Sequence, residues 1–270
     1  MTQATARGRV VLITGASTGI GRLCAERLAA RGWRVFGAAR TPVAIDGVEA
    51  IEMDVDDDAS VESGVAQLLE KAGRLDALVN NAGYSMRGSV EDVSMAEARA
   101  IFETNFFGAL RLCRAAAPAL RESRGVIVNM SSLAARIGLP FTAHYCASKA
   151  ALEALSEALR FEMRPFGVRV AIIEPGDFKT GIHTARRLSQ ATKEGVYATA
   201  FDLFLRKRRD FEDKATTAEP VAAAVERILD EPAPAMRAVV AMPSQRLLLL
   251  VNRFAPQRVY EWCMRKILGQ

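Results

Sequence analysis

Short apolar runs alternate with longer helical patterns along most of this 270-residue chain. The apolar runs, each about as long as a β-strand, occupy residues 9–14, 33–39, 48–55, 75–83, 125–132, 167–176 and 237–242. The helical patterns include residues 20–30, 60–71, 94–122, 143–164 and 218–229. Nearly continuous apolar strands belong in a parallel sheet that helices cover on both faces. The alternation therefore predicts one doubly wound α/β domain over residues 1–270, with about seven parallel strands.

Two stretches depart from this alternation. Residues 177–217 carry no regular pattern and are long for a connection, so we expect a lid over a binding site. Within them, the basic run FLRKRRDF (204–211) is either a solvated helix face or a contact for an anionic lipid or an acyl carrier.

Residues 244–270 continue past the last strand as a helical extension, with Val259, Trp262, Cys263 and Ile267 on one helical face. Basic residues surround that face. It is expected to dock on the body of the protein, to contact a second subunit or to lie on a membrane surface.

Composition excludes several classes of protein. The net charge of +5 is too small to identify a partner, and no DNA- or RNA-binding signature accompanies it, so no nucleic-acid partner is expected. The four cysteines match neither a zinc site nor a disulfide framework, and no metal is expected. A signal peptide and an apolar run of ~18–20 residues are both absent. We therefore expect a cytoplasmic protein, with membrane-surface contact limited to the C-terminal extension.

A glycine-rich turn, TGASTGIG, joins the first strand to the first helix. Gly15, Gly19 and Gly21 allow a close approach of the backbone, and the helix N-terminus that follows favours an anion. A tight turn of small residues is the simpler alternative. Because the turn follows the first strand of an alternating α/β pattern, it predicts dinucleotide binding. The expected contacts also include Ser17, Thr18 and Ile20.

The end of the second strand bears on the choice of cofactor. An NAD site usually offers a carboxylate there, which bonds the ribose 2′-hydroxyl. Here the strand ends at Ala39 and is followed by Arg40 and Thr41. A guanidinium suits a 2′-phosphate, so NADP(H) is favoured over NAD(H). Asp54 and Val55, after the third strand, are expected to flank the adenine.

Tyr145 and Lys149 lie four residues apart in a helical stretch, HYCASKAALEAL. They therefore share a helix face. A phenol can donate a proton to a developing alkoxide, and a nearby cation would lower the pKa of that phenol. The alternative is a half-buried ring beside a surface charge.

Taken together, these motifs resemble the short-chain dehydrogenase/reductase family in its single-domain branch. The resemblance covers about residues 8–242 and rests on TGASTGIG (14–21), NNAG (80–83), Asn105, MSS (130–132), YCASK (145–149) and EPG (174–176). It implies a Rossmann-like fold and a catalytic tetrad of Asn105, Ser132, Tyr145 and Lys149, with Ser131 structural. The segments around Tyr145 and residues 165–176 look most like enzymes of steroids, retinoids and other lipophilic alcohols.

The resemblance also implies binding residues. Asn81, Ala82 and Gly83 would lie beside the adenine ribose, and Pro175, Gly176 and Thr180 beside the nicotinamide. The substrate cleft would be lined by Leu133, Leu139, Phe141, Phe178 and Ile182, with Tyr84 and Met86 nearby. This set is apolar and includes no obvious arginine for a carboxylate.

The expected function is that of an NADP(H)-dependent oxidoreductase. It would interconvert a secondary alcohol and a ketone or aldehyde on a small lipophilic substrate, by hydride transfer with Tyr145 as general acid and base. A homodimer or homotetramer is expected. The alternative is an NADP-sensing regulatory or binding protein with the same fold and no turnover, which would not need Ser132, Tyr145 and Lys149 together.

Overall fold

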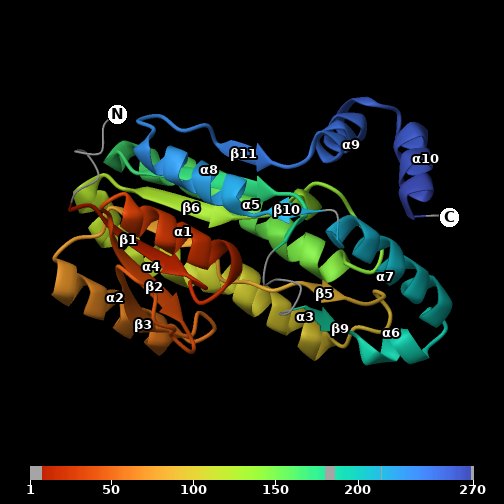
Figure 1. Cartoon of the computed structure of the whole chain (residues 1–270), viewed down its shortest axis with the longest axis horizontal. Helices are drawn as coiled ribbons and strands as arrows, with labels where there is room; N and C mark the ends of the chain where they lie inside the picture. The colour runs from red at the N-terminus through yellow and green to blue at the C-terminus, as the bar shows by residue number, and fades with distance from the viewer. Residues whose placement is uncertain (1–7, 180–185, 214, 269–270) are drawn as a thin grey trace.

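Seven parallel strands form the central sheet of the computed structural model, which describes residues 8–179, 186–213 and 215–268 (Figure 1). Their order is β11-β7-β6-β4-β1-β2-β3. The strands are β1 (Val10–Thr14), β2 (Arg34–Ala39), β3 (Val48–Glu52), β4 (Ala77–Asn80), β6 (Val126–Met130), β7 (Arg169–Pro175) and β11 (Arg237–Val240). The order reverses beside β1, so a crevice opens at the carboxyl ends of β1 and β4. The doubly wound α/β prediction is confirmed.

Helices bury both faces of this sheet. On one face lie α1 (Gly19–Ala30) and α8 (Glu219–Asp230), which share a core with the strands. On the other face lie α2 (Asp58–Ala72), α4 (Ala109–Ser123) and α5 (Ala143–Met163) (Figure 1). Because both faces are covered, the side chains of β1 and β6 are buried along their whole length. This explains why the strands are apolar without alternation.

The stretch predicted as helical from residue 94 to 122 is interrupted by a wider turn. Helix α3 (Met95–Phe102) continues into a π-helical segment, Glu103–Gly108, and then into α4. Asn105 lies in that segment and is 1% exposed. A π-helical turn inside an α-helix commonly marks a functional site.

Residues 177–217 are more regular than their sequence indicates. The described part contains α6 (Gln190–Glu194), α7 (Ala198–Asp213) and the short strands β8 (Phe178–Lys179), β9 (Arg187–Leu188) and β10 (Thr216–Thr217). Strand β9 pairs with β5 (Met86–Arg87), and β8 pairs with β10. Phe201 and Phe204 of α7 pack against Phe141. This distant apolar contact orders the segment, and a local sequence pattern does not reveal it.

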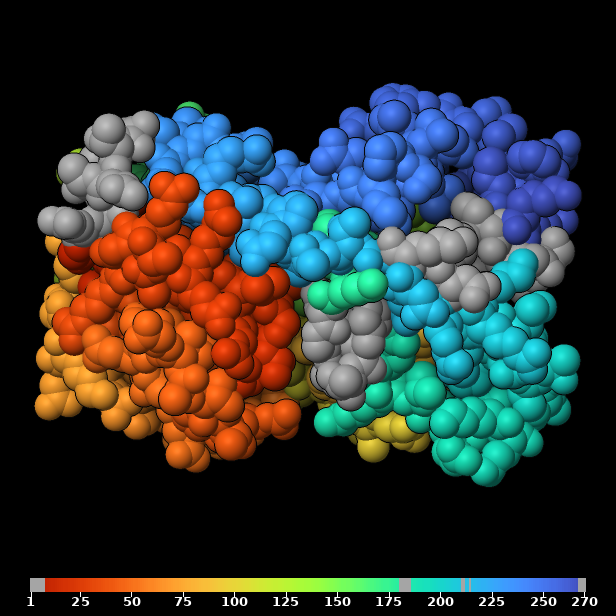
Figure 2. Space-filling view, viewed as in Figure 1, coloured from red at the N-terminus to blue at the C-terminus, as the bar shows by residue number. Residues whose placement is uncertain are grey.

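The C-terminal extension forms two helices, α9 (Pro243–Phe254) and α10 (Gln257–Leu268). In the space-filling view they form the upper right corner of the molecule (Figure 2). Val259 and Trp262 are exposed, Cys263 is half-buried, and Met264 on another face of α10 is buried. The side chain of Ile267 is outside the described residues. Within the described chain, no helix is long and apolar enough to cross a bilayer.

A capping box begins the helix that leads to Asn105. The amide of Glu97 donates to Ser94 Oγ (3.2 Å), and the amide of Ser94 donates to Glu97 Oε2 (2.9 Å). We expect Ser94→Ala to lower the free energy of unfolding by about 1 kcal/mol, because an amide at the helix N-terminus loses its acceptor. Urea denaturation measures this change. Glu97→Gln keeps an oxygen acceptor and should cost less, and equal stabilities of all three proteins would contradict the assignment.

Candidate active site

The glycine turn after β1 leaves space for a ligand at the start of α1. Gly15 and Gly19 have φ of +65° and +57°, a region that favours glycine. A Cβ on Gly21 would lie 2.3 Å from the Gly15 carbonyl oxygen, so α1 can pack this closely only with glycine. The side chain of Thr18, the N-cap, makes no capping bond within the described chain, and the first turn carries no acidic residue. These uncapped amides fit the pyrophosphate of a dinucleotide.

Asn81 fixes the shape of this turn. Its Nδ2 donates to the carbonyl oxygens of Thr14 (2.9 Å) and Gly15 (3.3 Å). In return, Thr14 Oγ1 accepts from the amides of Asn81 and Ala82, both at 3.0 Å. The side chain of Asn81 therefore holds the glycine turn against the end of β4, while the backbone of Ala82 and Gly83 faces the cleft.

A cleft with a volume of about 630 Å³ lies at the carboxyl ends of the strands. The predicted residues that line it are Gly15, Ser17, Thr18, Gly19, Ile20, Arg40, Asp54, Val55, Asn81, Ala82, Gly83, Tyr84, Ser132, Leu133, Leu139, Tyr145, Lys149, Pro175, Gly176 and Phe178. Asn105, Gly21, Thr41, Met86 and Phe141 do not line it. Phe141 packs on α7 instead, and Met86 is buried. Thr180 and Ile182 lie outside the described residues.

Tyr145 and Ser132 meet inside this cleft. Ser132 follows β6, and its hydroxyl lies close enough to the Tyr145 phenol to act on the pKa of Tyr145. Burial raises the pKa of Tyr145, and the nearby Ser132 hydroxyl opposes that rise. The sequence led us to expect that Lys149 would lower this pKa. Burial instead raises the pKa of Tyr145 and is the largest influence on it, so the phenol stays protonated at neutral pH.

Lys149 is 5% exposed, and its Nζ donates to the carbonyl oxygen of Met130 at 2.8 Å. Burial lowers the pKa of Lys149 to about 8, and the nearby Glu153 carboxylate opposes that shift. A group with this pKa can take up and release a proton near neutral pH.

Asn105 is buried outside the cleft lining and bonds the backbone next to the site. Its Oδ1 accepts from the amide of Tyr84, and its Nδ2 donates to the carbonyl oxygen of Tyr84 and to Ser148 Oγ, each at 3.0 Å. Ser148 Oγ donates in turn to the carbonyl oxygen of Tyr145 at 2.8 Å. A Cβ on Gly83 would lie 2.8 Å from Asn105 Oδ1 and 3.5 Å from Lys149 Nζ. Asn105 therefore joins the loop after β4 to the helix turn that carries Tyr145.

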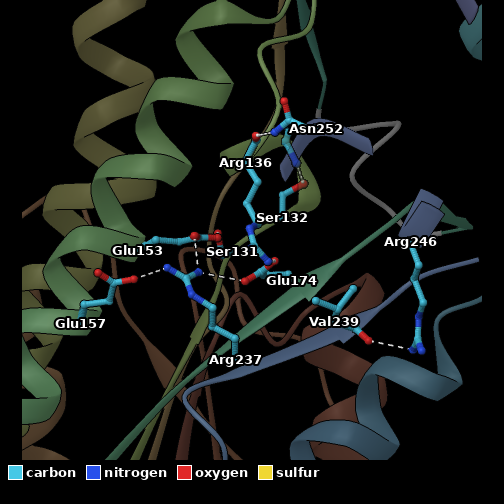
Figure 3. A network of polar contacts seen from close by, with 11 residues as sticks. Ser131, Ser132, Arg136, Glu153, Glu157, Glu174, Arg237, Val239, Arg246 and Asn252 are labelled. Atoms are coloured by element: carbon cyan, nitrogen blue, oxygen red, sulfur yellow. Dashed lines mark hydrogen bonds and ion pairs between the residues drawn. The ribbon is translucent and has the colours of Figure 1, made fainter. Parts of the chain in front are cut away.

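A charged network supports the other side of the site (Figure 3). Ser131 Oγ donates to Glu153 Oε1 at 2.7 Å, and Glu153 also pairs with Arg237. Arg237 bonds Glu174 at 2.8 Å, and Arg136 pairs with the same fully buried carboxylate at 3.3 Å. Since Ser131 is bound to Glu153, Ser132 is the serine that faces Tyr145.

The far end of the cleft surrounds Arg40, which is exposed at the end of β2. Asp56, which the sequence analysis missed, lies there as well. Its Oδ2 accepts from Thr104 Oγ1 at 2.9 Å, whereas its buried Oδ1 has no hydrogen-bond partner among the described residues. Such an acceptor beside Asp54 and Val55 fits a donor group on a bound nucleotide.

Four arginines line the cleft near β5, β9 and α7, where the sequence analysis predicted an apolar wall. They are Arg87, Arg186, Arg187 and Arg208. Asp177, Gln245, Leu248 and Met264 also line it and were likewise missed. Arg208 belongs to the basic run noted in the sequence, but no local pattern indicates that these side chains converge.

The buried Lys149 makes stability depend on pH. The unfolded lysine keeps its proton up to its ordinary pKa of 10.5, whereas the folded one loses it near pH 8. Between these values stability rises with pH, because the unfolded state binds more protons. We expect Lys149→Met to lack this rise, so the stability difference between the two proteins changes by up to about 1.4 kcal/mol per pH unit above pH 8.

Urea denaturation from below pH 8 to about pH 10 measures that difference. Burial raises the pKa of Cys24 and Cys113 to about 12, which lowers stability at alkaline pH in both proteins alike and cancels in the comparison. A difference that stays constant over this range would contradict the burial of Lys149 as the cause.

Comparison with known proteins agrees with the geometry. Residues 9–191 match the family model described as short chain dehydrogenase. Over 95% of this chain and 97% of the relative, 34% of residues are identical to 3-ketodihydrosphingosine reductase of Bacteroides thetaiotaomicron. A short-chain dehydrogenase from Streptomyces avermitilis has 35% identity and a TM-score of 0.80, covering 96% of this chain and 98% of its own.

Two further solved structures contain cofactors. A short chain dehydrogenase from Burkholderia cenocepacia in complex with NADP has a TM-score of 0.76 at 26% identity, covering 95% of this chain and 98% of its own. The 3-ketoacyl-(acyl-carrier-protein) reductase of Brucella melitensis, complexed with NADH, has a TM-score of 0.75 at 25% identity, covering 89% and 99%. The relatives match this chain over nearly its whole length, and the seven-stranded fold agrees with them. This chain therefore belongs to the short-chain dehydrogenase/reductase family and is an oxidoreductase that acts on CH–OH groups with NAD(P).

Proposed function

We propose that this protein interconverts a secondary alcohol and a ketone or aldehyde on a lipophilic substrate, with NADP(H) as cofactor and Tyr145 as general acid and base. The observation that carries the proposal is that Tyr145, Ser132 and the buried Lys149 line one cleft, with Ser132 close enough to act on the pKa of Tyr145. A binding protein without turnover would not need a protonated phenol at this position.

In the direction of reduction, Ser132 and Tyr145 would bind the carbonyl oxygen of the substrate. The cofactor, when bound, supplies the hydride to the carbonyl carbon. Tyr145 gives its proton to the oxygen as negative charge develops there, and the alcohol forms. Lys149, with a pKa of about 8, would return a proton to the phenolate. Asn105 would keep the Tyr145 turn in place through Ser148. Oxidation runs through the same steps in reverse.

Arg40 is the basis for proposing NADP(H). Related structures are solved with NADP and with NADH, so the family by itself leaves the choice open. Arg40 lines the cleft where β2 ends, and a guanidinium there would pair with a 2′-phosphate. Asp54 and Val55 would flank the adenine, and the backbone of Pro175 and Gly176 would contact the nicotinamide, with Thr180 as a further contact.

Apolar side chains support a lipophilic substrate. Leu133, Leu139 and Phe178 line the cleft, joined by Leu248 of α9 and Met264 of α10. The segment 177–217 would act as the lid, and the extension 244–270 would complete the wall. The chain would form a homodimer or homotetramer. The exposed Leu247, Leu250, Phe254 and Trp262 of the extension offer an apolar surface for a subunit or for a membrane.

Removing the phenol oxygen of Tyr145 tests the catalytic assignment. We expect Tyr145→Phe to lower kcat on lipophilic ketones by about a hundredfold to ten-thousandfold, because the reacting oxygen loses its proton donor. The ring still packs against the apolar cluster that contains Tyr84 and Met86, so stability and NADPH binding should be retained. NADPH absorbance follows turnover, and NADPH fluorescence measures binding.

Tyr197→Phe is the matched control, because the Tyr197 hydroxyl bonds Glu91 and does not line the cleft. It should retain turnover. Near-normal turnover of a folded Tyr145→Phe protein would refute the acid and base role. Absence of turnover in the unmutated protein, across a panel of lipophilic ketones and alcohols, would favour the NADP-sensing alternative.

A charge reversal at Arg40 tests the choice of cofactor. We expect Arg40→Asp to weaken NADPH binding about tenfold or more and to leave NADH binding unchanged or improved, because a carboxylate repels a phosphate and accepts from a ribose hydroxyl. Fluorescence titration with both cofactors measures this. Arg114→Asp, at an exposed position outside the cleft, is the control. An unchanged preference for NADPH in Arg40→Asp would overturn the proposal.

A further inference from the structure

The substrate side of the cleft contains cations that hydride transfer and the cofactor contacts proposed above do not use. Arg87, Arg186, Arg187 and Arg208 come from β5, from β9 with the residue before it, and from α7, which lie close together in the fold (Figure 1). We propose that Arg187 binds an anionic group of the substrate, so that the substrate is an anionic amphiphile rather than a neutral lipid. This inference rests on the proposed function for the position of the reacting carbonyl.

Three of these arginines form ion pairs with carboxylates. Arg87 and Arg186 both bond Glu212, at 2.5 Å and 2.7 Å. Arg208 pairs with Asp177, which also accepts from Gln245 at 2.7 Å. These ion pairs join α7 to the neighbouring segments and fix the wall of the cleft.

Arg187 differs from the other three. No carboxylate among the described residues lies within ion-pair distance of it, and its side chain is exposed while it lines the cleft. Its guanidinium lies over the Tyr84 ring, 4.3 Å from the centroid, and its Nη1 is 3.5 Å from Tyr84 Oη. The backbone of Arg187 is held as well, since its amide donates to the Ser85 carbonyl oxygen at 2.9 Å. Stacking on an aromatic ring restrains the planar guanidinium group and leaves the N–H groups along its edge free to bind oxygen atoms.

The position of Tyr84 shows how Arg187 lies relative to Tyr145. Tyr145 packs against the apolar cluster that contains Tyr84, Met86 and Ile101. Tyr84 therefore belongs both to the stack with Arg187 and to the cluster beside the residue that would protonate the carbonyl. A molecule whose carbonyl meets Tyr145 can direct a second oxygen group at Arg187 without leaving the cleft.

The apolar part of the cleft lining indicates that the rest of the substrate is apolar. Leu133, Ile137 and Leu139 follow β6, and Leu248 and Met264 come from the C-terminal helices. A small hydrophilic anion would leave this surface without a partner. An anionic group at Arg187 joined to an apolar body along α9 and α10 fits both parts of the lining.

Octanoate and octan-1-ol are suitable probes because they share an apolar chain and differ in charge. Calorimetric titration of each into the protein saturated with NADPH involves no turnover, because an alcohol is oxidised only with NADP⁺ and a carboxylate is not reduced by hydride transfer. It therefore tests this inference even if the proposed reaction is wrong. We expect octanoate to bind more tightly than octan-1-ol. Arg187→Gln should weaken octanoate binding about tenfold, the loss of one charge-assisted contact, and leave octan-1-ol unaffected.

Two matched variants sharpen the result. Arg187→Lys keeps the charge and should recover part of the octanoate affinity, whereas Arg206→Gln, on the exposed side of α7, should change nothing. Equal affinity of Arg187→Gln and the unmutated protein for octanoate would overturn the inference. So would a loss confined to NADPH affinity, because Arg187 would then serve the cofactor. Tyr145→Phe should still bind octanoate, which separates the anion site from the catalytic assignment.

Discussion

Helix α5 is fastened to the end of β6 by two side chains one turn apart, and the rest of the site depends on this attachment. Lys149 bonds the carbonyl oxygen of Met130, and Glu153 bonds the hydroxyl of Ser131. Together they set the distance and rotation of the helix relative to the strand. Tyr145 lies one turn before Lys149, and Ser132 follows Ser131, so the same two contacts bring the phenol to the serine.

Burying the charged groups of this attachment has an energetic cost that the surrounding network offsets. Two buried carboxylates, Glu153 and Glu174, would be strongly destabilising without partners. Arg237 of β11 bonds both, and Arg136 adds a second cation to Glu174. The network thus ties β11, an edge strand of the sheet, to α5 and to the end of β7. Arg237 is the central member of this network, because its removal would leave the Glu153 carboxylate without its cation.

The two ends of the cleft differ in how far apart in the sequence their lining residues lie. The proposed nucleotide end comes from loops that directly follow β1, β2, β3 and β4, so its residues are close to one another by topology. The proposed substrate end is assembled from β5, β9, α7, α9 and α10, most of which are far apart in sequence. This difference explains why the glycine turn and Tyr145 could be found by pattern, whereas the arginines around Glu212 could not.

The sequence by itself determined the features that depend on neighbours along the chain. The strand and helix alternation, the glycine turn and the spacing of Tyr145 and Lys149 are local, and their geometry follows from strand and helix periods. Tertiary structure decided what local spacing cannot. Burial reversed the expected direction of the Tyr145 pKa, Glu153 engaged the hydroxyl of Ser131, and packing against α7 removed Phe141 from the lining. The physical reason is the same in each case: desolvation, charge and packing depend on which distant segments surround a residue.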